Sequence, residues 1–350
     1  MSATEHERVN ELLAAWSLDA CTVDEELLVE AHLLGCGECA EAASHFRQVA
    51  GRLGSAVATP PPPGLRAKVL AAAFAQRPPV MPAAVAPYAS EVRKLDVLLA
   101  ALAPAAWRAL TVVNGWTVQE LVAHLAALDG LLAAQLQVPV AFPASIPPAG
   151  PGPSNGTGPL HPVSAAAQAA AREQAPEATR AAWRAQADGI VDRVRQDGDR
   201  VAGRTVELAG LAWPLELQLL GRAFETWIHA DDIRQGAGVA PDPPAPEHLN
   251  QLVGAVVRLL PGALLDSGRD HPGRSARLVL SGDGGGEWLV PLGRDSGRAE
   301  PPAVTIGLDL LDFCYLVGGR RDPAQVPCEV SGDRTSAADL LAAAATFDRD

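Results

Sequence analysis

His32, Cys36 and Cys39 are the first side chains whose types and spacing suit metal chemistry. They stand four and three residues apart, so the face of one helix and the turn at the end of that helix can bring an imidazole and two thiolates to a single ion. Soft sulfur and borderline nitrogen suit zinc, and a closed structural site needs a fourth ligand. His6, on the preceding segment, is the predicted fourth ligand.

Two other interpretations of this group stay open. His45 or Cys21 could take the place of His6 as fourth ligand. Alternatively, no ion is bound, His32 is a surface histidine, and the cysteines are small core residues.

A second group is divided between two distant segments. Glu225 and His229 are four residues apart and project from one helix face, and His124, about a hundred residues earlier, can meet them in a bundle core. Two imidazoles and a carboxylate leave coordination positions open for water or substrate, which is typical of catalytic sites. Asp232 is a candidate to orient the His229 ring. The alternative is a buried histidine pair bridged to Glu225 without a metal.

Apolar residues at helical spacing predict the elements that position both groups. Helices are expected in the first 53 residues, with a capping box at Thr22 and a third helix over 40–53. Apolar residues at helical spacing also recur between residues 88 and 235. Within this region Thr117 is the expected N-cap of the helix that carries His124. A long loop at 138–162 precedes bundle helices predicted at 164–196 and 215–235.

The C-terminal part changes to short apolar alternations typical of strands. The glycine-rich run at 282–286 indicates a hairpin turn, because no helix follows it as a phosphate-binding loop requires. The expected elements are strands at 276–280, 287–292, 303–306 and 326–330, with helices at 247–266, at 309–317 and from 336.

Proline-rich segments divide this predicted, mostly α fold. The expected parts are a zinc-binding helical module at 1–76, a linker at 77–87, a metal-binding helical bundle at 88–246 and a small α+β domain at 247–350.

The composition excludes several classes of protein. The 350 residues are 48% hydrophobic and 20% charged, which is ample for buried cores. A net charge of −13 argues against binding to nucleic acid or to an anionic membrane.

The first twenty residues lack a signal-peptide pattern and no apolar run is long enough to span a membrane, so a cytoplasmic protein is expected. Five cysteines, an odd number, fit metal or thiol chemistry better than a disulfide framework.

The first 76 residues resemble the zinc-binding anti-sigma domain of bacteria. The similarity rests on His6, the segment 30–33, Cys36 and Cys39, and on the segment 62–70, which is similar to that family's additional helix. The resemblance implies zinc at this site and a sigma factor as partner. By the same resemblance Cys21 is a candidate thiol that displaces zinc on oxidation, and the alternative is a buried small side chain.

Residues 88–350 resemble the mycothiol-dependent maleylpyruvate isomerase family. The resemblance implies a DinB-like four-helix bundle, a sterol-carrier-like α+β domain, mycothiol as cofactor and a divalent metal, such as zinc, on His124, Glu225 and His229. The matching stretches are 115–125, 225–234, 310–320 and 331–333.

The implied chemistry is that of a thiol on a metal. An open zinc site can bind a cofactor's sulfur, lower its pKa and hold the thiolate near a small electrophilic substrate, for isomerisation or S-transfer. Arg320 and Arg321 are either an anion clamp or a solvated surface pair. Cys314 and Cys328 are expected in the core with no role. The alternative function is an anti-sigma-type regulator whose bundle senses a ligand or serves as a scaffold without turnover.

Overall fold

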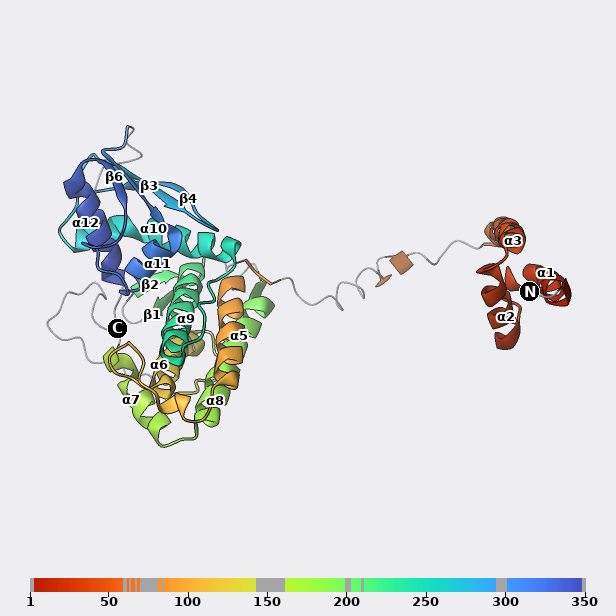
Figure 1. Cartoon of the computed structure of the whole chain (residues 1–350), viewed down its shortest axis with the longest axis horizontal. Coiled ribbons are helices and arrows are strands. Elements are labelled where there is room, and N and C mark those ends of the chain that lie inside the picture. The colour runs from red at the N-terminus through yellow and green to blue at the C-terminus, as the bar shows by residue number, and fades with distance from the viewer. Residues whose placement is uncertain are drawn as a thin grey trace. The chain divides into compact units, whose positions relative to one another are not determined.

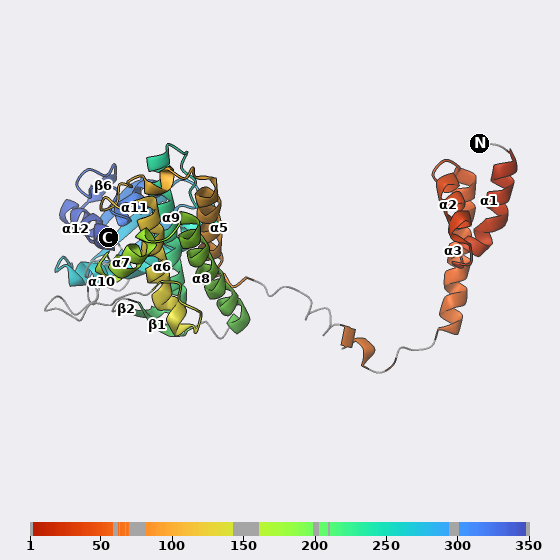
Figure 2. The same ribbon diagram turned by 90° about the horizontal axis from the view of Figure 1, so that it is seen from below.

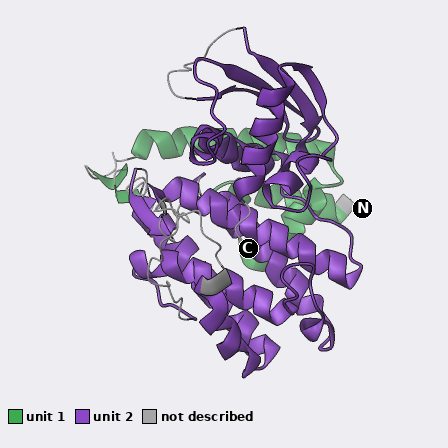
Figure 3. Ribbon diagram, turned by 90° about the vertical axis from the view of Figure 1, so that its left-hand side faces the viewer, with its two compact units in different colours: residues 1–78 green, residues 79–350 purple. Residues whose placement is uncertain are grey.

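The computed structural model divides the chain into two compact units, Met1–Pro78 and Pro79–Asp350 (Figure 3). The residues it describes are 3–58, 62, 64–66, 68–69, 81–83, 85–142, 161–198, 203–208, 211–293 and 301–347. The predicted mostly helical fold, with a small C-terminal sheet, is confirmed.

The helices of the first unit with described bounds are α1 (Ala3–Trp16), α2 (Val23–Leu33) and α3 (Gly37–Val57) (Figure 1). Their core consists of Val9, Leu13, Trp16, Val29, Cys39 and Ala43. The predicted capping box is present: the Thr22 side chain accepts from the Glu25 amide, and the Glu25 carboxylate accepts from the Thr22 amide. The helix predicted over 40–53 is longer at both ends, because no proline interrupts it before Pro60.

The segment similar to an additional anti-sigma helix is only partly described. Leu65, Arg66, Lys68 and Val69 are helical, whereas Leu70, the last residue of the segment, lies outside the described residues. The side chains of Leu65 and Val69 are exposed.

The second unit contains a helical bundle formed by α5 (Ala86–Ala101), α6 (Val118–Gln135), α8 (Pro176–Asp197) and α9 (Leu215–Ala237), which lie together in Figure 2. Each packs against two others, α5 against α8 and α9, and α6 against the same two. A fifth helix, α7 (His161–Arg172), packs along α6. A short 3-10 helix, Ala106–Arg108, precedes α6.

Two details of the bundle differ from the prediction. The helix expected over 164–196 is two helices, because the Pro176 ring fits the first turn of a new helix and cannot continue α7. A hairpin of β1 (Thr205–Leu208) and β2 (Leu211–Pro214) precedes α9 and was not predicted. Most of the predicted loop at 138–162 lies outside the described residues.

The C-terminal part is a four-stranded sheet with helices. Its order is β4-β3-β5-β6, with β3 parallel to β5 and the other neighbours antiparallel. Its elements are α10 (Pro246–Asp266), β3 (Ser275–Ser281), β4 (Gly286–Pro291), β5 (Val304–Asp309), α11 (Leu310–Val317), β6 (Glu329–Gly332), α12 (Arg334–Ala344) and a 3-10 turn (Ala345–Phe347).

The glycine-rich run forms the turn between β3 and β4, as predicted. Gly284 has a φ of +83°, and a side chain there would collide with the carbonyl of Pro246. The last strand begins at Glu329 rather than at Val326, because Val326 and Pro327 belong to the preceding loop.

The bundle and the C-terminal part share one hydrophobic core. Ile228 of α9, for example, packs against the Gly318 position after α11. The boundary expected between residues 246 and 247 falls in the first turn of α10, inside this unit. Among the described helices, α10 is the one long and apolar enough to cross a membrane, and here it packs against α9, α12 and β4.

Candidate metal centres

The first candidate centre lies within the front unit. One donor atom each from His6, His32, Cys36 and Cys39 comes within 4.8 Å of all the others. The Nδ1 atom of His6 lies 3.6 Å from Cys36 Sγ and 3.5 Å from Cys39 Sγ. The predicted four residues are therefore brought together from α1, α2 and the start of α3.

The chemistry of these four side chains fits a metal ion. Both ring nitrogens of His32 are buried and have no hydrogen-bond partner in the described part of the chain, which is costly without a ligand. Burial, followed by the neighbouring Cys36, raises the pKa of the Cys39 thiol. A divalent cation would reverse this effect and bind the thiolate.

The two competitors lie outside this cluster. His45 is exposed on α3. The thiol of Cys21 points to the carbonyl of Leu12, with 3.9 Å between sulfur and oxygen.

The second candidate centre lies in the bundle. The rings of His124, on α6, and His229, on α9, meet edge to face with centroids 5.4 Å apart, and both are fully buried. The Glu225 Oε2 atom lies 3.5 Å from His229 Nε2. The two imidazoles thus meet from two helices, and the carboxylate approaches one of them; these are side chains that zinc and related ions accept as ligands.

Local structure explains how these residues meet. The Thr117 side chain accepts from the Glu120 amide in a capping box, so α6 begins at a defined residue and places His124 on its second turn. Glu225 and His229 are one turn apart on α9 and therefore share a face.

Each histidine ring has a neighbour on its Nδ1 side. Ser164 Oγ of α7 lies 2.8 Å from His124 Nδ1, and Asp232 Oδ2 lies 3.1 Å from His229 Nδ1. Contacts of this kind fix the orientation and tautomer of a metal-binding ring. Asp232 was expected in this role from its spacing. Ser164 was missed, because it lies 40 residues from His124 and no local pattern joins the two.

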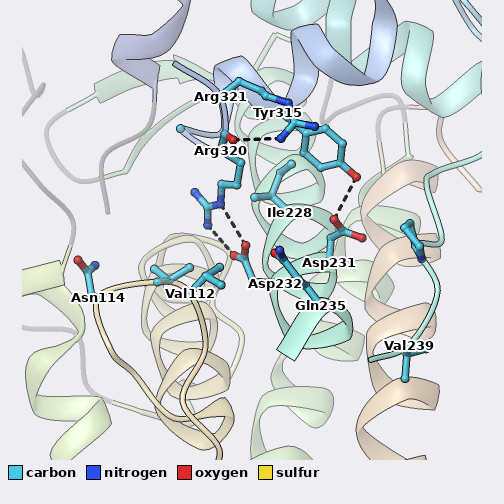
Figure 4. Close-up of a pocket in the computed structure, with 13 residues that line it drawn as sticks. Val112, Asn114, Ile228, Asp231, Asp232, Gln235, Val239, Tyr315, Arg320 and Arg321 are labelled. Atoms are coloured by element: carbon cyan, nitrogen blue, oxygen red, sulfur yellow. Dashed lines mark hydrogen bonds and ion pairs between the residues drawn. The ribbon is translucent and has the colours of Figure 1, made fainter. Parts of the chain in front are cut away.

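Arg320 also holds Asp232, as Figure 4 shows, and its Nη2 atom lies 3.4 Å from His229 Nδ1. Its Nε and Nη2 atoms lie 3.1 and 2.6 Å from the two carboxylate oxygens. Burial opposes ionisation of Asp232, but hydrogen bonds from His229 and Arg320 outweigh it and lower the pKa of the carboxyl group. Arg321 instead pairs with Asp312 at 3.2 Å on the surface. The two arginines expected as a clamp therefore contact different carboxylates.

A pocket of about 750 Å³ opens beside this ion pair, between the bundle and the loop after α11. Figure 4 shows Arg320, Asp232, Tyr315 and Asp231 along its wall. The Tyr315 hydroxyl donates to Asp231 over 3.0 Å. The pocket thus lies on the Nδ1 side of His229, with Asp232 between the pocket and the ring.

The bundle also matches a known family in sequence. Residues 88–234 match the family model described as the mycothiol maleylpyruvate isomerase N-terminal domain. The predicted resemblance is confirmed for the bundle. His124, Glu225 and His229 all lie within the matched residues. The anti-sigma resemblance of the front unit stays a prediction.

Two solved structures are similar to the chain at low identity. A crystal structure of the mycothiol-dependent maleylpyruvate isomerase has 17% identity and a TM-score of 0.47, covering 71% of this chain and 91% of its own. A mutant of that enzyme has 17% identity and a TM-score of 0.46, covering 68% and 88%. No curated protein matches the chain.

The remaining cysteines contact neither centre among the described residues. Cys314 is buried on α11, as expected, and burial raises the pKa of its thiol far above the ordinary value. Cys328 was expected in the core but is exposed, because it lies in the loop before β6 rather than within the strand.

Proposed function

We propose that the second unit is a metal-dependent and thiol-dependent enzyme of the maleylpyruvate isomerase type. The observation that carries this proposal is the convergence of His124, Glu225 and His229 at the centre of a bundle whose sequence matches that family's N-terminal domain. By analogy with the family description, the thiol is mycothiol and the substrate is a small electrophile. We further propose that the enzyme works in the cytoplasm, as expected from the sequence.

In this proposal His124, Glu225 and His229 hold a divalent ion. Such an ion lowers the pKa of a bound thiol and so supplies a nucleophile at neutral pH. Ser164 and Asp232 orient the two imidazoles. The surrounding side chains exclude water from the site, since both rings are fully buried.

Arg320 has two roles in this proposal. Its guanidinium fixes Asp232, and its partly exposed edge at the pocket can attract a carboxylate of the substrate. Arg321 adds positive charge at the pocket rim, and its guanidinium carbon lies 5.4 Å from the centre of the Tyr315 ring. Isomerisation and S-transfer both fit this arrangement.

Activity of the metal-loaded protein tests the proposal. The chain should isomerise maleylpyruvate, or join the thiol through its sulfur to an electrophilic carbon, only when a low-molecular-weight thiol is supplied, with mycothiol better than glutathione. His229→Ala and Glu225→Ala should abolish turnover, whereas Cys314→Ser and Cys328→Ser should leave it nearly intact, because the nucleophile belongs to the cofactor. A metallated chain that neither binds a thiol by calorimetry nor turns over either substrate class would refute the proposal.

We propose a second function for the front unit, binding of a sigma factor through a zinc-stabilised helical module. It is favoured by the four-donor cluster together with apolar side chains exposed on the second half of α3, namely Val49, Leu53 and Val57. If the bundle has no turnover, the whole chain is an anti-sigma-type regulator. Co-purification of a sigma factor with the chain from the native cell, abolished by Leu53→Glu, would support this function. Repeated failure to recover a sigma factor would contradict it and leave the enzyme as the one proposed function.

A further inference from the structure

A short loop at 110–117 leads into the first turn of α6. A β-bridge between Leu110 and Thr117 closes this loop at its base. The amide and the hydroxyl of Thr111 both donate to the carbonyl of Trp116, over 2.7 and 3.0 Å. The backbone of Trp116 is therefore fixed, although its side chain is partly exposed.

The tip of the loop is a tight turn with an unusual backbone. The Trp116 amide donates to the carbonyl of Val113 over 2.9 Å, and the two residues between them, Asn114 and Gly115, have φ values of +48° and +67°. Asn-Gly is a pair that such turns favour, because both residues tolerate a positive φ. The turn thus gives the loop a defined shape and the Trp116 side chain a defined direction.

The indole of Trp116 lies against a ring of the candidate centre. Its centroid is 5.0 Å from that of His124, with 37° between the two planes. The same imidazole meets His229 of α9 edge to face, and Ser164 Oγ of α7 lies 2.8 Å from its Nδ1 atom. Groups from three separate elements therefore surround the His124 ring.

The two histidines are held in different ways. His229 has the Asp232 carboxylate on its Nδ1 side, and an ionised carboxylate can only accept, so it fixes both the tautomer and the direction of the ring. His124 has the Ser164 hydroxyl there, which can rotate and either donate or accept. Because such a contact restrains a ring less, packing has to supply the remaining restraint. The indole of Trp116 is placed to supply it.

We propose that Trp116 is a positioning residue, which holds the His124 imidazole in the orientation that binds a metal ion. This inference rests on the proposed function, in which His124 is a ligand. A metal-bound imidazole carries part of the ion's positive charge, and an electron-rich indole beside it stabilises that charge. Trp116 therefore favours the metal-loaded centre as well as the correct ring orientation.

Co²⁺ affinity of the full chain tests this role. The parent chain carries Cys36→Ser and Cys39→Ser, so that the front cluster does not compete for the ion. Trp116→Leu should weaken Co²⁺ binding by about 3- to 10-fold, the effect expected for the loss of one aromatic contact. It should also shift the visible absorption of the bound ion, because His124 is held less firmly. Trp116→Phe keeps a ring beside His124 and should restore most of the affinity and the parent spectrum.

Substitutions at Gly115 test the same role without altering a side chain at the centre. A Cβ atom there would meet nothing within 4 Å, so the positive φ decides the effect. Gly115→Asn tolerates this φ and should leave the affinity unchanged. Gly115→Val opposes it, should displace Trp116, and should weaken Co²⁺ binding as Trp116→Leu does.

The matched control for Trp116→Leu is Trp288→Leu. Trp288 is also partly buried, but it lies on β4 with its ring against Gly286. Its loss should leave the Co²⁺ affinity and the visible spectrum unchanged. Circular dichroism of each variant without metal identifies those that are folded.

The outcomes distinguish the two proposals. If Trp116→Phe binds Co²⁺ as weakly as Trp116→Leu, the tryptophan only fills space and the inference is wrong, while the metal site stands. Should Trp116→Leu fail to fold, the Gly115 pair decides, because equal affinities of Gly115→Asn and Gly115→Val overturn the inference. A parent chain that binds no Co²⁺ contradicts the proposed function and this inference together.

Discussion

The Nδ1 atom of His229 lies 3.1 Å from the Oδ2 atom of Asp232, one turn further along the same helix. This contact turns the opposite nitrogen, Nε2, toward Glu225. Arg320 holds the same carboxylate from the C-terminal part of the chain. The orientation of one candidate ligand therefore depends on residues of both the bundle and the α+β part.

Removal of the Asp232 charge should weaken the bundle site without emptying the front one. In Asp232→Asn the His229 ring and the Arg320 guanidinium lose their shared anion, and metal affinity should fall by about 10- to 100-fold. Equilibrium dialysis measures this loss. Asp231→Asn is the matched control, since Asp231 contacts Tyr315 instead. An unaltered affinity in Asp232→Asn would remove the orienting role.

The purified chain should hold two ions, because the two donor sets are separate and chemically different. Changing both Cys36 and Cys39 to Ser should remove one ion and leave the second unit folded. Elemental analysis and calorimetry measure the two effects. Loss of both ions from this variant would contradict the division into independent sites.

A fragment ending at Gln76 should be helical with zinc and lose helix when the metal is chelated. Among the described residues its core has six buried apolar side chains, too few for a stable fold without the ion. Circular dichroism before and after chelation checks this. A spectrum that stays the same would show that zinc has no structural role there.

The contribution of Glu91 to the stability of the second unit should fall as the pH rises from about 4.5 to 7. Burial raises the pKa of Glu91 to about 7 from an ordinary value of 4.5, Lys94 opposes this only in part, and Asp242 adds to it. A raised carboxyl pKa means that the folded state binds the proton more tightly, so its stabilising contribution is complete below pH 4.5 and lost as the pH passes 7.

Glu91→Gln should therefore stabilise the second unit at pH 8 by roughly 2 to 3 kcal/mol, with little effect at pH 4. Calorimetric unfolding at the two pH values measures the difference. Glu173→Gln, at an exposed position, serves as the control. A variant whose stability relative to wild type is the same at both pH values would exclude Glu91 as the source of the dependence.

Short spacings made much of this structure predictable. The grouping of His32 with Cys36 and Cys39, and of Glu225 with His229, follows from helix geometry alone. The capping boxes at Thr22 and Thr117 are equally local, and both helix starts were expected. The small sheet was predicted because its strands alternate between apolar and polar residues over several positions.

Features that depend on distant contacts were not predictable in this way. Asp129 and Arg222 each resemble an ordinary charged residue of an amphipathic helix, and their pairing is decided only when α6 packs near α9. The hairpin before α9 has strands of four residues, too short for alternation to distinguish from a helix start. Pro176 was passed over because the alanine-rich sequence on both sides favours helix.

The two candidate centres also differ in the length of chain that must be ordered before each can exist. His6 and Cys39 are 33 residues apart, whereas Arg320 is 91 residues from His229. Because closing a longer loop costs more entropy and slows folding, the front cluster can assemble from the first part of the chain to be synthesised. The bundle centre must wait until α9 and the residues after α11 have been made. During its synthesis on the ribosome, the protein is therefore expected to acquire its first metal ion well before its reactive centre has formed.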